Sequence, residues 1–240
     1  MSHTRTSSKA DPSERTSAPA TEAVEDYVKA IYALQRQEGG PVSTSALAER
    51  LDVAPPSVTA MVKRLDELHL VRYEPYHGVT LTGAGERLAL EVIRHHRLIE
   101  AFLADALEMP WDRVHDEAEV LEHYISEDLE RRIAEKLGNP SLDPHGDPIP
   151  TPELALAADR TTALDRLAAG DVAIFSRVSD SDPAMLRYLA ERGIRPGARL
   201  RVTEVQPFGG PVVVDVDGHE HALGGNLAQR LRVERAESSP

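Results

Sequence analysis

Two neighbouring helical segments with the same arrangement of histidines and glutamates constrain this chain more than any other feature. They fill residues 94–132 and meet at the sequence Met109-Pro110-Trp111-Asp112. The pairs four residues apart are His96/Glu100, His115/Glu119 and Glu119/His123. Side chains three or four residues apart share one helix face, so adjacent helices can bring imidazole nitrogens and carboxylate oxygens to one metal ion. The alternative is that these residues are solvated charges on amphipathic helices.

Composition excludes several classes of protein. The chain has 240 residues, of which 41% are hydrophobic, enough for roughly one to three domains with apolar cores. It has no cysteine, which excludes disulfides, thiolate metal sites and a cysteine nucleophile. No signal peptide or membrane-spanning stretch is evident, so we expect a soluble, cytoplasmic protein without membrane contact. The net charge of −13 means that nucleic-acid binding would need a locally basic face.

The N-terminal region changes character at residue 21. Residues 1–20 are Ser, Thr, Pro, Ala and scattered charges, a composition that predicts a disordered tail. Residues 21–37 carry apolar side chains at helical spacing, with Thr21 as the expected N-cap. The sequence Gly39-Gly40-Pro41 is expected to end this helix.

Residues 43–81 have the order helix, turn, helix, hairpin. A short helix is expected after Ser43, and a second opens at Pro55-Pro56-Ser57, where proline is tolerated in a first turn. Short strands are expected over residues 70–73 and 79–81. We therefore predict a winged helix-turn-helix over residues 21–82, the alternative being a helical hairpin that packs on another protein.

The second helix of this unit carries the candidate DNA contacts, because in helix-turn-helix proteins that helix enters the major groove. Small side chains in its first turns leave room for close approach, and basic ones reach phosphates or base edges. The candidate DNA-binding residues are Pro56, Ser57, Thr59, Ala60, Lys63, Arg64 and Arg72. Residues 22–74 contain nine acids and six bases, whereas residues 86–136 contain fourteen acids and seven bases. The acid excess therefore lies mostly in the central helices.

Residues 83–138 predict two long central helices. The first is expected to begin after Thr82, as N-cap, and to reach about Glu108. The second is expected to run without a break over residues 112–137, with Gly138 as its C-terminal stop. Its apolar stripe is wider than one partner helix needs, so we expect part of it to form a homodimer interface.

The C-terminal part divides into a linker and a small domain. Residues 139–160 are rich in proline, which predicts a loosely packed linker. His145 and Asp147 could bind metal there, but in so polar a loop we expect them to be solvated. Residues 161–235 alternate short strand patterns with Gly and Pro turns, and residues 183–192 read as a short helix. This pattern predicts an SH3-like (FeoA-like) β barrel. The expected fold class is mostly α with a small β component.

At this point the segment order resembles a known family. The sequences RHHRLIEAFL and VHDEAEVLEH and the linker DPHGDPIP are similar to those of metal-dependent repressors of the diphtheria toxin repressor family, in particular its manganese-sensing branch. The resemblance covers about residues 22–235. It implies a winged helix-turn-helix DNA-binding domain, a helical metal-binding and dimerisation domain, and a C-terminal SH3-like domain.

The resemblance also implies two metal positions. The primary position is implied to use Asp26, Glu119, Glu122 and His123. The ancillary position is implied to use His96, Glu100 and His115, with Asp182 as a carboxylate from the barrel. Iron-type members carry Met and Cys at the positions of Asp26 and Glu119, and an amide at the position of Met185. Some manganese-type members carry a further carboxylate where this chain has Lys29, so a binuclear primary site is not expected here.

The implied function is a Mn²⁺-dependent transcriptional repressor. It would bind palindromic double-stranded operators as a metal-activated homodimer, control metal-uptake and homeostasis genes, and use no small organic substrate. Hard oxygen ligands favour Mn²⁺. Fe²⁺ is the alternative within the family, and Co²⁺, Ni²⁺ or Zn²⁺ are also expected to bind in vitro, by the usual order of affinities.

Two other functions compete with this interpretation. A di-metal carboxylate oxidase would need Glu-x-x-His pairs from two helices, and the central helices contain none. We therefore expect no enzyme. A winged-helix regulator that senses an organic ligand between its helices would explain the DNA-binding unit without any metal, and a metal response would distinguish the two.

Overall fold

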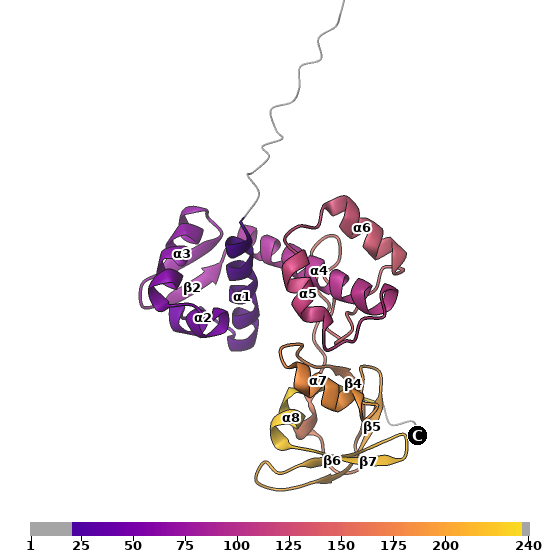
Figure 1. Cartoon of the computed structure of the whole chain (residues 1–240). Coiled ribbons are helices and arrows are strands. Elements are labelled where there is room, and N and C mark those ends of the chain that lie inside the picture. Colours follow the sequence, from indigo (N-terminus) through magenta and orange to yellow (C-terminus); the bar gives the residue numbers. More distant parts are fainter. Residues whose placement is uncertain (1–20, 237–240) are drawn as a thin grey trace, which may run out of the picture.

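The computed structural model describes residues 21–236, in three groups of elements (Figure 1). The expected tail, residues 1–20, lies outside the described residues. The helices are α1 (Glu22–Glu38), α2 (Thr44–Leu51), α3 (Pro55–Glu67), α4 (Gly83–Ala106), α5 (Val114–Leu121), α6 (Glu127–Lys136), α7 (Pro183–Ala190), α8 (Gly225–Arg230) and the 3₁₀ turn η1 (Leu164–Arg166). The strands are β1 (Val71–Glu74), β2 (Gly78–Leu81), β3 (Thr162–Ala163), β4 (Val172–Arg177), β5 (Arg199–Val205), β6 (Val212–Val216), β7 (His219–Leu223) and β8 (Arg232–Arg235).

The first group is a winged helix-turn-helix, as the sequence predicts. α1, α2 and α3 surround one apolar core, and the antiparallel hairpin β1–β2 forms the wing. Ser43 Oγ accepts a hydrogen bond from the Ala46 N–H at 3.0 Å, which satisfies a free donor at the start of α2. α3 begins with proline in its first turn. The chain therefore presents α3 and the wing on one unit.

At the start of α4, the backbone at Gly85 passes very close to the backbone at Leu70, next to the wing. A Cβ on Gly85 would lie 1.9 Å from the carbonyl oxygen of Leu70, so only glycine fits there. Thr82 Oγ1 accepts a hydrogen bond from the Gly85 N–H at 3.2 Å, which confirms Thr82 as the N-cap. The long helix α4 then runs from the wing into the central group (Figure 1).

α1 connects the winged helix-turn-helix to the central helices. It packs against α2 and β2 on one side and against α4 on the other (Figure 1). Val28 and Ile31 are fully buried in the core of the first group. Polar residues of α1 that face the central group therefore lie on a helix that also contributes to the core of the first group.

The predicted second central helix is wrong in one respect, because the chain breaks it into α5 and α6. Residues 122–126 form a turn, and Ser126 Oγ caps α6 by accepting a hydrogen bond from the Leu129 N–H at 3.3 Å. The break leaves Leu121 and Leu129 43% and 49% exposed, although both belong to the apolar stripe. It also turns the Glu122 side chain inwards, where it is 1% exposed.

The expectation of a loosely packed linker is also wrong. Ile149 packs with Leu98 and Ile133, and Arg94 donates a hydrogen bond to the carbonyl oxygen of Pro150 at 2.6 Å. His145 is fully buried rather than solvated. Prolines prevent regular secondary structure in this segment. They do not prevent its side chains from being buried against α4, so the amino-acid composition of the segment did not predict its packing.

The C-terminal group is a six-stranded antiparallel sheet in the order β3-β8-β4-β5-β6-β7. It curls around an apolar core that includes Phe175, Leu186 and Leu200, all fully buried. The expected SH3-like barrel is thus present. The helix α8 was not predicted, and the last strand, β8, begins at Arg232, just after that helix.

Candidate metal centres and DNA-contacting surface

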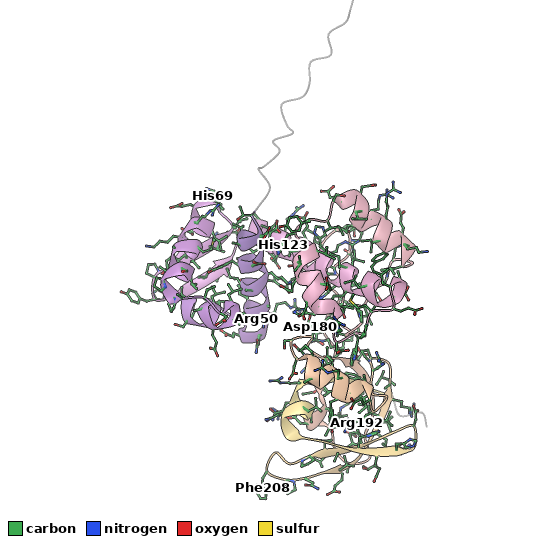
Figure 2. The ribbon with its side chains drawn as sticks, viewed as in Figure 1. Arg50, His69, His123, Asp180, Arg192 and Phe208 are labelled. Carbon is green, nitrogen blue, oxygen red and sulfur yellow. The ribbon has the colours of Figure 1, made fainter. Side chains whose placement is uncertain are left out.

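Four side chains from three parts of the chain converge at the junction between the barrel and the central helices. We call them the ancillary cluster: His96, Glu100, His115 and Asp180. His96 Nε2 lies 3.1 Å from Glu100 Oε1 and 3.2 Å from His115 Nδ1. Asp180 Oδ2 lies 3.2 Å from His115 Nδ1 and 3.9 Å from His96 Nε2. Asp180 comes from the barrel, at its contact with the helices (Figure 2).

The ancillary cluster fits a divalent cation on its own geometry. Both carboxylate oxygens of Glu100 are buried without a well-formed hydrogen bond from the described part of the chain. A buried ionised carboxylate is costly unless it is paired or coordinates a metal. Two imidazoles and two carboxylates, with ligand atoms a few ångströms apart, are a donor set suited to Mn, Fe or Zn ions. The arrangement explains why Glu100 is buried.

The electrostatics of the cluster without a cation are those of strong ion pairs. Burial alone would lower the pKa of His115, but the neighbouring carboxylates of Asp180 and Glu100 outweigh it and raise the pKa to about 10. Burial likewise opposes the shift at Asp180, whose pKa is held well below its usual range by hydrogen bonds from His115 and His96. Protons on the imidazoles thus supply the positive charge that the carboxylates require.

The barrel carboxylate expected from the sequence is Asp182, and the structure puts Asp180 there instead. Asp182 caps α7: its Oδ1 accepts hydrogen bonds from the N–H groups of Ala184 and Met185, both at 3.1 Å. The Asp182 side chain therefore caps α7 rather than facing the histidines. Met185 is buried in the barrel core. A capping pattern Asp182-Pro183 at the start of a helix is the sequence signal that could have separated the two aspartates.

The second site lies between α1 and the end of α5. We call the residues expected there the primary cluster: Asp26, Glu119, Glu122 and His123. His123 Nε2 lies 3.2 Å from Asp26 Oδ1 and 3.7 Å from Glu122 Oε1. Glu119 does not join this group. Its carboxylate lies instead near the Glu122 carboxylate and the His96 imidazole. Two carboxylates and an imidazole that converge from separate elements form a donor set suited to a divalent cation.

Lys29 explains the position of Glu119. Its ammonium lies 2.7 Å from Glu119 Oε1 and 2.8 Å from Glu122 Oε2. Burial alone would lower the pKa of Lys29, but these two carboxylates outweigh it and raise the pKa. The sequence has a lysine here where the resemblance implies a carboxylate in some manganese-type members. Lys29 therefore puts a positive charge beside the primary cluster.

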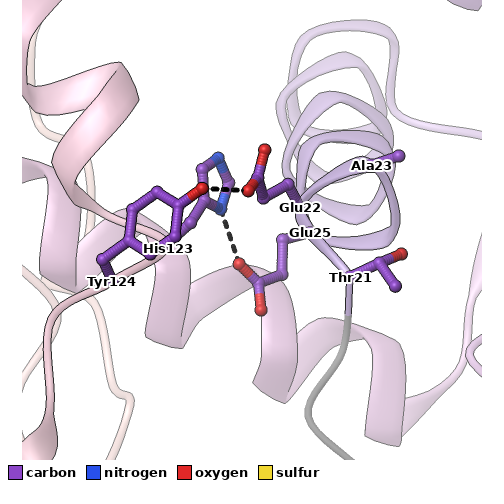
Figure 3. A pocket seen from close by; sticks show the side chains of 6 residues that line it. All are labelled: Thr21, Glu22, Ala23, Glu25, His123 and Tyr124. Carbon is purple, nitrogen blue, oxygen red and sulfur yellow. Dashed lines mark hydrogen bonds and ion pairs between the residues drawn. The ribbon is translucent and has the colours of Figure 1, made fainter.

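Two residues at the start of α1 that the sequence analysis missed support the turn at residues 123–124. Glu25 Oε2 lies 2.6 Å from His123 Nδ1, and Tyr124 donates a hydrogen bond to Glu22 (Figure 3). They line a pocket of about 400 Å³ with Thr21 and Ala23. A carboxylate on one imidazole nitrogen fixes the tautomer and leaves the other nitrogen free to bind a metal. Acidic residues in a first turn are common, so the sequence alone could not separate Glu25 from a favourable helix-end charge.

The candidate DNA-binding residues all lie in the winged helix-turn-helix, and most of them are exposed. Pro56, Ser57, Ala60, Lys63 and Arg64 are exposed on α3, and Thr59 is half-buried with its hydroxyl donated to the carbonyl of Pro55. Arg72 is exposed on β1. The wing tip adds Tyr76, fully exposed, which the sequence analysis did not select.

Comparisons with known proteins agree with this architecture. The family described as "Iron dependent repressor, N-terminal DNA binding domain" matches residues 20–79, its "metal binding and dimerisation domain" matches residues 82–151, and the FeoA domain matches residues 162–235. The iron-dependent repressor IdeR of Mycobacterium tuberculosis (strain ATCC 25618 / H37Rv) is 36% identical over 227 residues, which cover 89% of this chain and 97% of the relative. This chain belongs to the diphtheria toxin repressor family. Its members are metal-dependent transcriptional repressors.

Other members of the family extend the comparison. The diphtheria toxin repressor of Corynebacterium efficiens is 32% identical over 227 residues, covering 90% of this chain and 96% of that protein. A solved structure described as a manganese-dependent transcriptional repressor in complex with manganese has 42% identity and a TM-score of 0.83, and the match covers 89% of this chain and 100% of that one. ScaR with bound Zn²⁺ has 32% identity and a TM-score of 0.75, over 89% of this chain and 99% of that one. In residues 21–236 of this family member, no helix is long and apolar enough to cross a membrane.

Proposed function

We propose that this protein is a Mn²⁺-dependent transcriptional repressor that binds palindromic operators as a homodimer and controls genes of metal uptake and homeostasis. The observation that carries the proposal is the residue type at the two positions that the resemblance assigns to the primary metal, Asp26 and Glu119. Both are carboxylates, whereas the resemblance to iron-type members implies Met and Cys at these positions. Hard oxygen ligands suit Mn²⁺ better than thioether and thiolate ligands do.

The metal would be held by residues from separate elements. The primary cluster would supply Asp26, Glu119, Glu122 and His123, and the ancillary cluster His96, Glu100, His115 and Asp180. Bound Mn²⁺ would supply positive charge that offsets the carboxylates and joins ligands from different helices. Co²⁺, Ni²⁺ and Zn²⁺ would also bind in vitro, since intrinsic affinity follows the usual order rather than biological need.

The chain's own residues transmit binding to the DNA-reading unit. Asp26 lies on α1, which packs against α2 and β2 as well as α4. Glu122 and His123 lie in the turn after α5. Holding Asp26 against His123 fixes α1, and with it α3, relative to the central helices. A ligand that binds this arrangement better than a looser one shifts the population towards it.

A dimer would convert this fixed orientation into operator recognition. The central helices expose apolar side chains that a partner copy would cover. These are Leu107, Val120, Leu121, Tyr124 and Leu129. Two recognition helices held at a set distance read half-sites one helical turn or a multiple of it apart. We propose that residues 21–82 bind DNA, that residues 83–138 hold metal and dimerise, that residues 139–160 connect them to the barrel, and that residues 161–235 supply the barrel ligand.

An Fe²⁺-dependent repressor is the second candidate. The observation that favours it is the 36% identity to proteins named iron-dependent repressor. The two candidates differ in which metal activates DNA binding at concentrations available in a cell. Both use the same fold and the same clusters.

Operator binding under controlled metal tests the proposal. A labelled promoter fragment from a metal-uptake gene is titrated with protein, and fluorescence anisotropy is followed with Mn²⁺, with Fe²⁺ under anaerobic conditions, and after chelator. We expect binding that Mn²⁺ switches on and chelator reverses. Activation by Fe²⁺ but not Mn²⁺ would favour the second candidate, and binding indifferent to every metal would contradict both.

Two variants make this experiment specific to the primary cluster. Asp26→Ala and Glu119→Ala are expected to abolish metal-dependent operator binding while the fold is retained, as judged by circular dichroism. Glu117→Ala, an exposed acid on the same helix as Glu119, is the matched control and should bind as the wild type does. Unchanged operator affinity in Asp26→Ala and Glu119→Ala would contradict the assignment of these ligands.

A further inference from the structure

His145 lies in the linker and is buried completely beside a residue of the ancillary cluster. Its Nδ1 lies 3.7 Å from Glu100 Oε1, and both side chains are 0% exposed. Within the described residues, His145 Nδ1 has no well-formed hydrogen bond, and neither has either oxygen of Glu100. Such an arrangement of unsatisfied buried polar atoms is costly, so it calls for an explanation.

The imidazole of His145 is held in place from its other side. Its Nε2 lies 2.7 Å from the carbonyl oxygen of Trp111 and donates to it, because a carbonyl oxygen can only accept. The rings of Trp111 and His145 stack with their centroids 5.8 Å apart and their planes 21° apart. Trp111 itself belongs to the apolar core of the barrel, although it lies in the α4–α5 connection. His145 therefore contacts both the ligand-bearing helix α4 and a residue buried in the barrel.

The backbone of the same turn joins the barrel directly. The Val178 N–H donates to the carbonyl oxygen of His145 at 3.1 Å, two residues before Asp180. Gly146 has φ +87°, and a Cβ there would lie 1.8 Å from the carbonyl oxygen of Ser176 at the end of β4. Asp143 Oδ1 closes the turn by accepting hydrogen bonds from the N–H groups of His145 and Asp147 at 2.8 and 2.9 Å. The turn thus positions the strand end that carries Asp180.

His145 is not itself arranged as a ligand of the ancillary cluster. The four ancillary side chains form one group, and His145 groups instead with Glu100 and Asp143. Glu100 is the residue common to both groups. Asp143 accepts hydrogen bonds within its own turn, and its carboxylate lies 3.6 Å from the Arg97 guanidinium, whose positive charge a further cation would face. A second cation in this group is therefore not favoured, and a positioning role is.

We propose that His145 is a positioning residue of the ancillary metal centre, which orients Glu100 and fastens the barrel, with Asp180, to the central helices. This inference rests on the proposed function. Some residues contact a metal ligand on the side away from the metal. Removing such a residue commonly lowers the metal affinity by about 10- to 100-fold. Filling of the ancillary cluster and docking of the barrel would then stabilise each other, since both depend on the Asp143–Gly146 turn.

Full-length protein titrated with Mn²⁺ tests this. Calorimetry separates tighter and weaker equivalents of metal, and the emission of Trp111, the only tryptophan of the chain, reports whether the barrel stays docked. His145→Gln keeps an amide N–H for the Trp111 carbonyl but puts no polar atom at the position of Nδ1. We expect it to bind the ancillary equivalent about 10- to 100-fold more weakly, with the primary equivalent and the Trp111 emission unchanged. His145→Asn, whose amide nitrogen takes the place of Nδ1, should recover part of the affinity.

A second variant breaks the turn without touching a side chain of either cluster. Gly146→Ala clashes with Ser176, and we expect a red-shifted Trp111 emission together with weaker ancillary binding. Gly170→Ala is the matched control, because Gly170 has φ +94° and a Cβ added there would have no atom of the described residues within 4 Å. It carries the same backbone strain without the clash and should bind as the wild type does.

The outcomes distinguish this inference from the proposed function. Ancillary affinity unchanged in His145→Gln, or a parallel weakening of both equivalents, would overturn the inference and leave Mn²⁺-dependent repression intact. Operator binding is measured on the same samples. Wild-type protein that binds the operator equally well in chelator would contradict the proposed function itself, and the inference with it.

Discussion

His96 Nδ1 lies 2.5 Å from Glu122 Oε2, so a single imidazole connects the two candidate metal positions. Its other nitrogen, Nε2, faces Glu100 and His115 in the ancillary cluster. Glu122 belongs to the primary cluster. A ligand that binds metal through one nitrogen and donates a proton to a carboxylate through the other has its tautomer fixed by that carboxylate. Loss of the His96 imidazole should therefore affect both positions.

Removal of His96 is the test of this coupling. We expect His96→Ala to lose the ancillary equivalent of Mn²⁺ and also to weaken the primary equivalent, by about 10-fold or more, because Glu122 loses its imidazole partner and keeps only Lys29 beside it. His96→Asn, which keeps an amide donor near Glu122, should lose only the ancillary equivalent. His115→Ala is the control that removes an ancillary ligand without contacting Glu122. Equal primary affinity in His96→Ala and His115→Ala would rule the coupling out.

Lys29 compensates carboxylates that a metal would otherwise neutralise. We expect Lys29→Gln to lower the stability of metal-free protein, by an amount between the roughly 1 kcal/mol of an exposed ion pair and the roughly 3 kcal/mol of a buried one. Glu122 is fully buried, whereas Glu119 is 42% exposed. Mn²⁺ should then raise the Tm of Lys29→Gln more than that of the wild type. Lys136→Gln, at an exposed position, is the control, and an equal Mn²⁺-dependent rise in all three proteins would refute the prediction.

Metal preference should follow the ligand atoms at Asp26 and Glu119. The double variant Asp26→Met/Glu119→Cys replaces two hard oxygen ligands by softer sulfur ligands, which favours Fe²⁺ over Mn²⁺. The measurement is the concentration of each metal that gives half-maximal operator binding, under anaerobic conditions. A double variant that keeps the wild-type order of metals would show that ligand hardness does not decide selectivity here.

Metal-free protein should be sensitive to alkali. The pKa of His115 is about 10 in the folded chain and 6.5 in the reference state, so its contribution to stability is full below pH 6.5 and is lost as the pH rises to 10. Urea unfolding in chelator at several pH values measures this. His115→Gln should have a shallower decline over the same interval. A wild type whose free energy of unfolding stays constant between pH 6.5 and 10 contradicts the assigned ion pairs.

The basic side chains of α3 should contribute to DNA binding through phosphates. Lys63→Gln is expected to weaken binding to all DNA sequences alike, and to reduce by about one the slope of log affinity against log salt concentration. Lys136→Gln, on α6, controls for the loss of one positive charge. A Lys63→Gln variant that changes the preferred sequence but not the salt slope would instead indicate a base contact.

Much of the fold and of the site was determined by the sequence alone. Helical periodicity and the capping residues Ser43 and Thr82 predicted the winged helix-turn-helix and the start of α4, because these signals depend on neighbours in the chain. The His and Glu spacing selected His96 and Glu100, since residues four apart on one helix share a face. It failed for Glu119 and His123, because α5 ends at Leu121 between them.

Tertiary structure decided the rest. Asp180 and Asp182 are two residues apart in a polar loop. The cap that Asp182 makes on α7 is local, whereas only the docking of the barrel determines that Asp180 faces the histidines. His145 is buried because α4 and the barrel close over it, although its proline-rich segment reads as a solvated linker. Lys29 reaches Glu119 and Glu122 across about 90 residues of sequence. Local patterns report which residues share a face, whereas contacts between distant segments depend on how those faces pack.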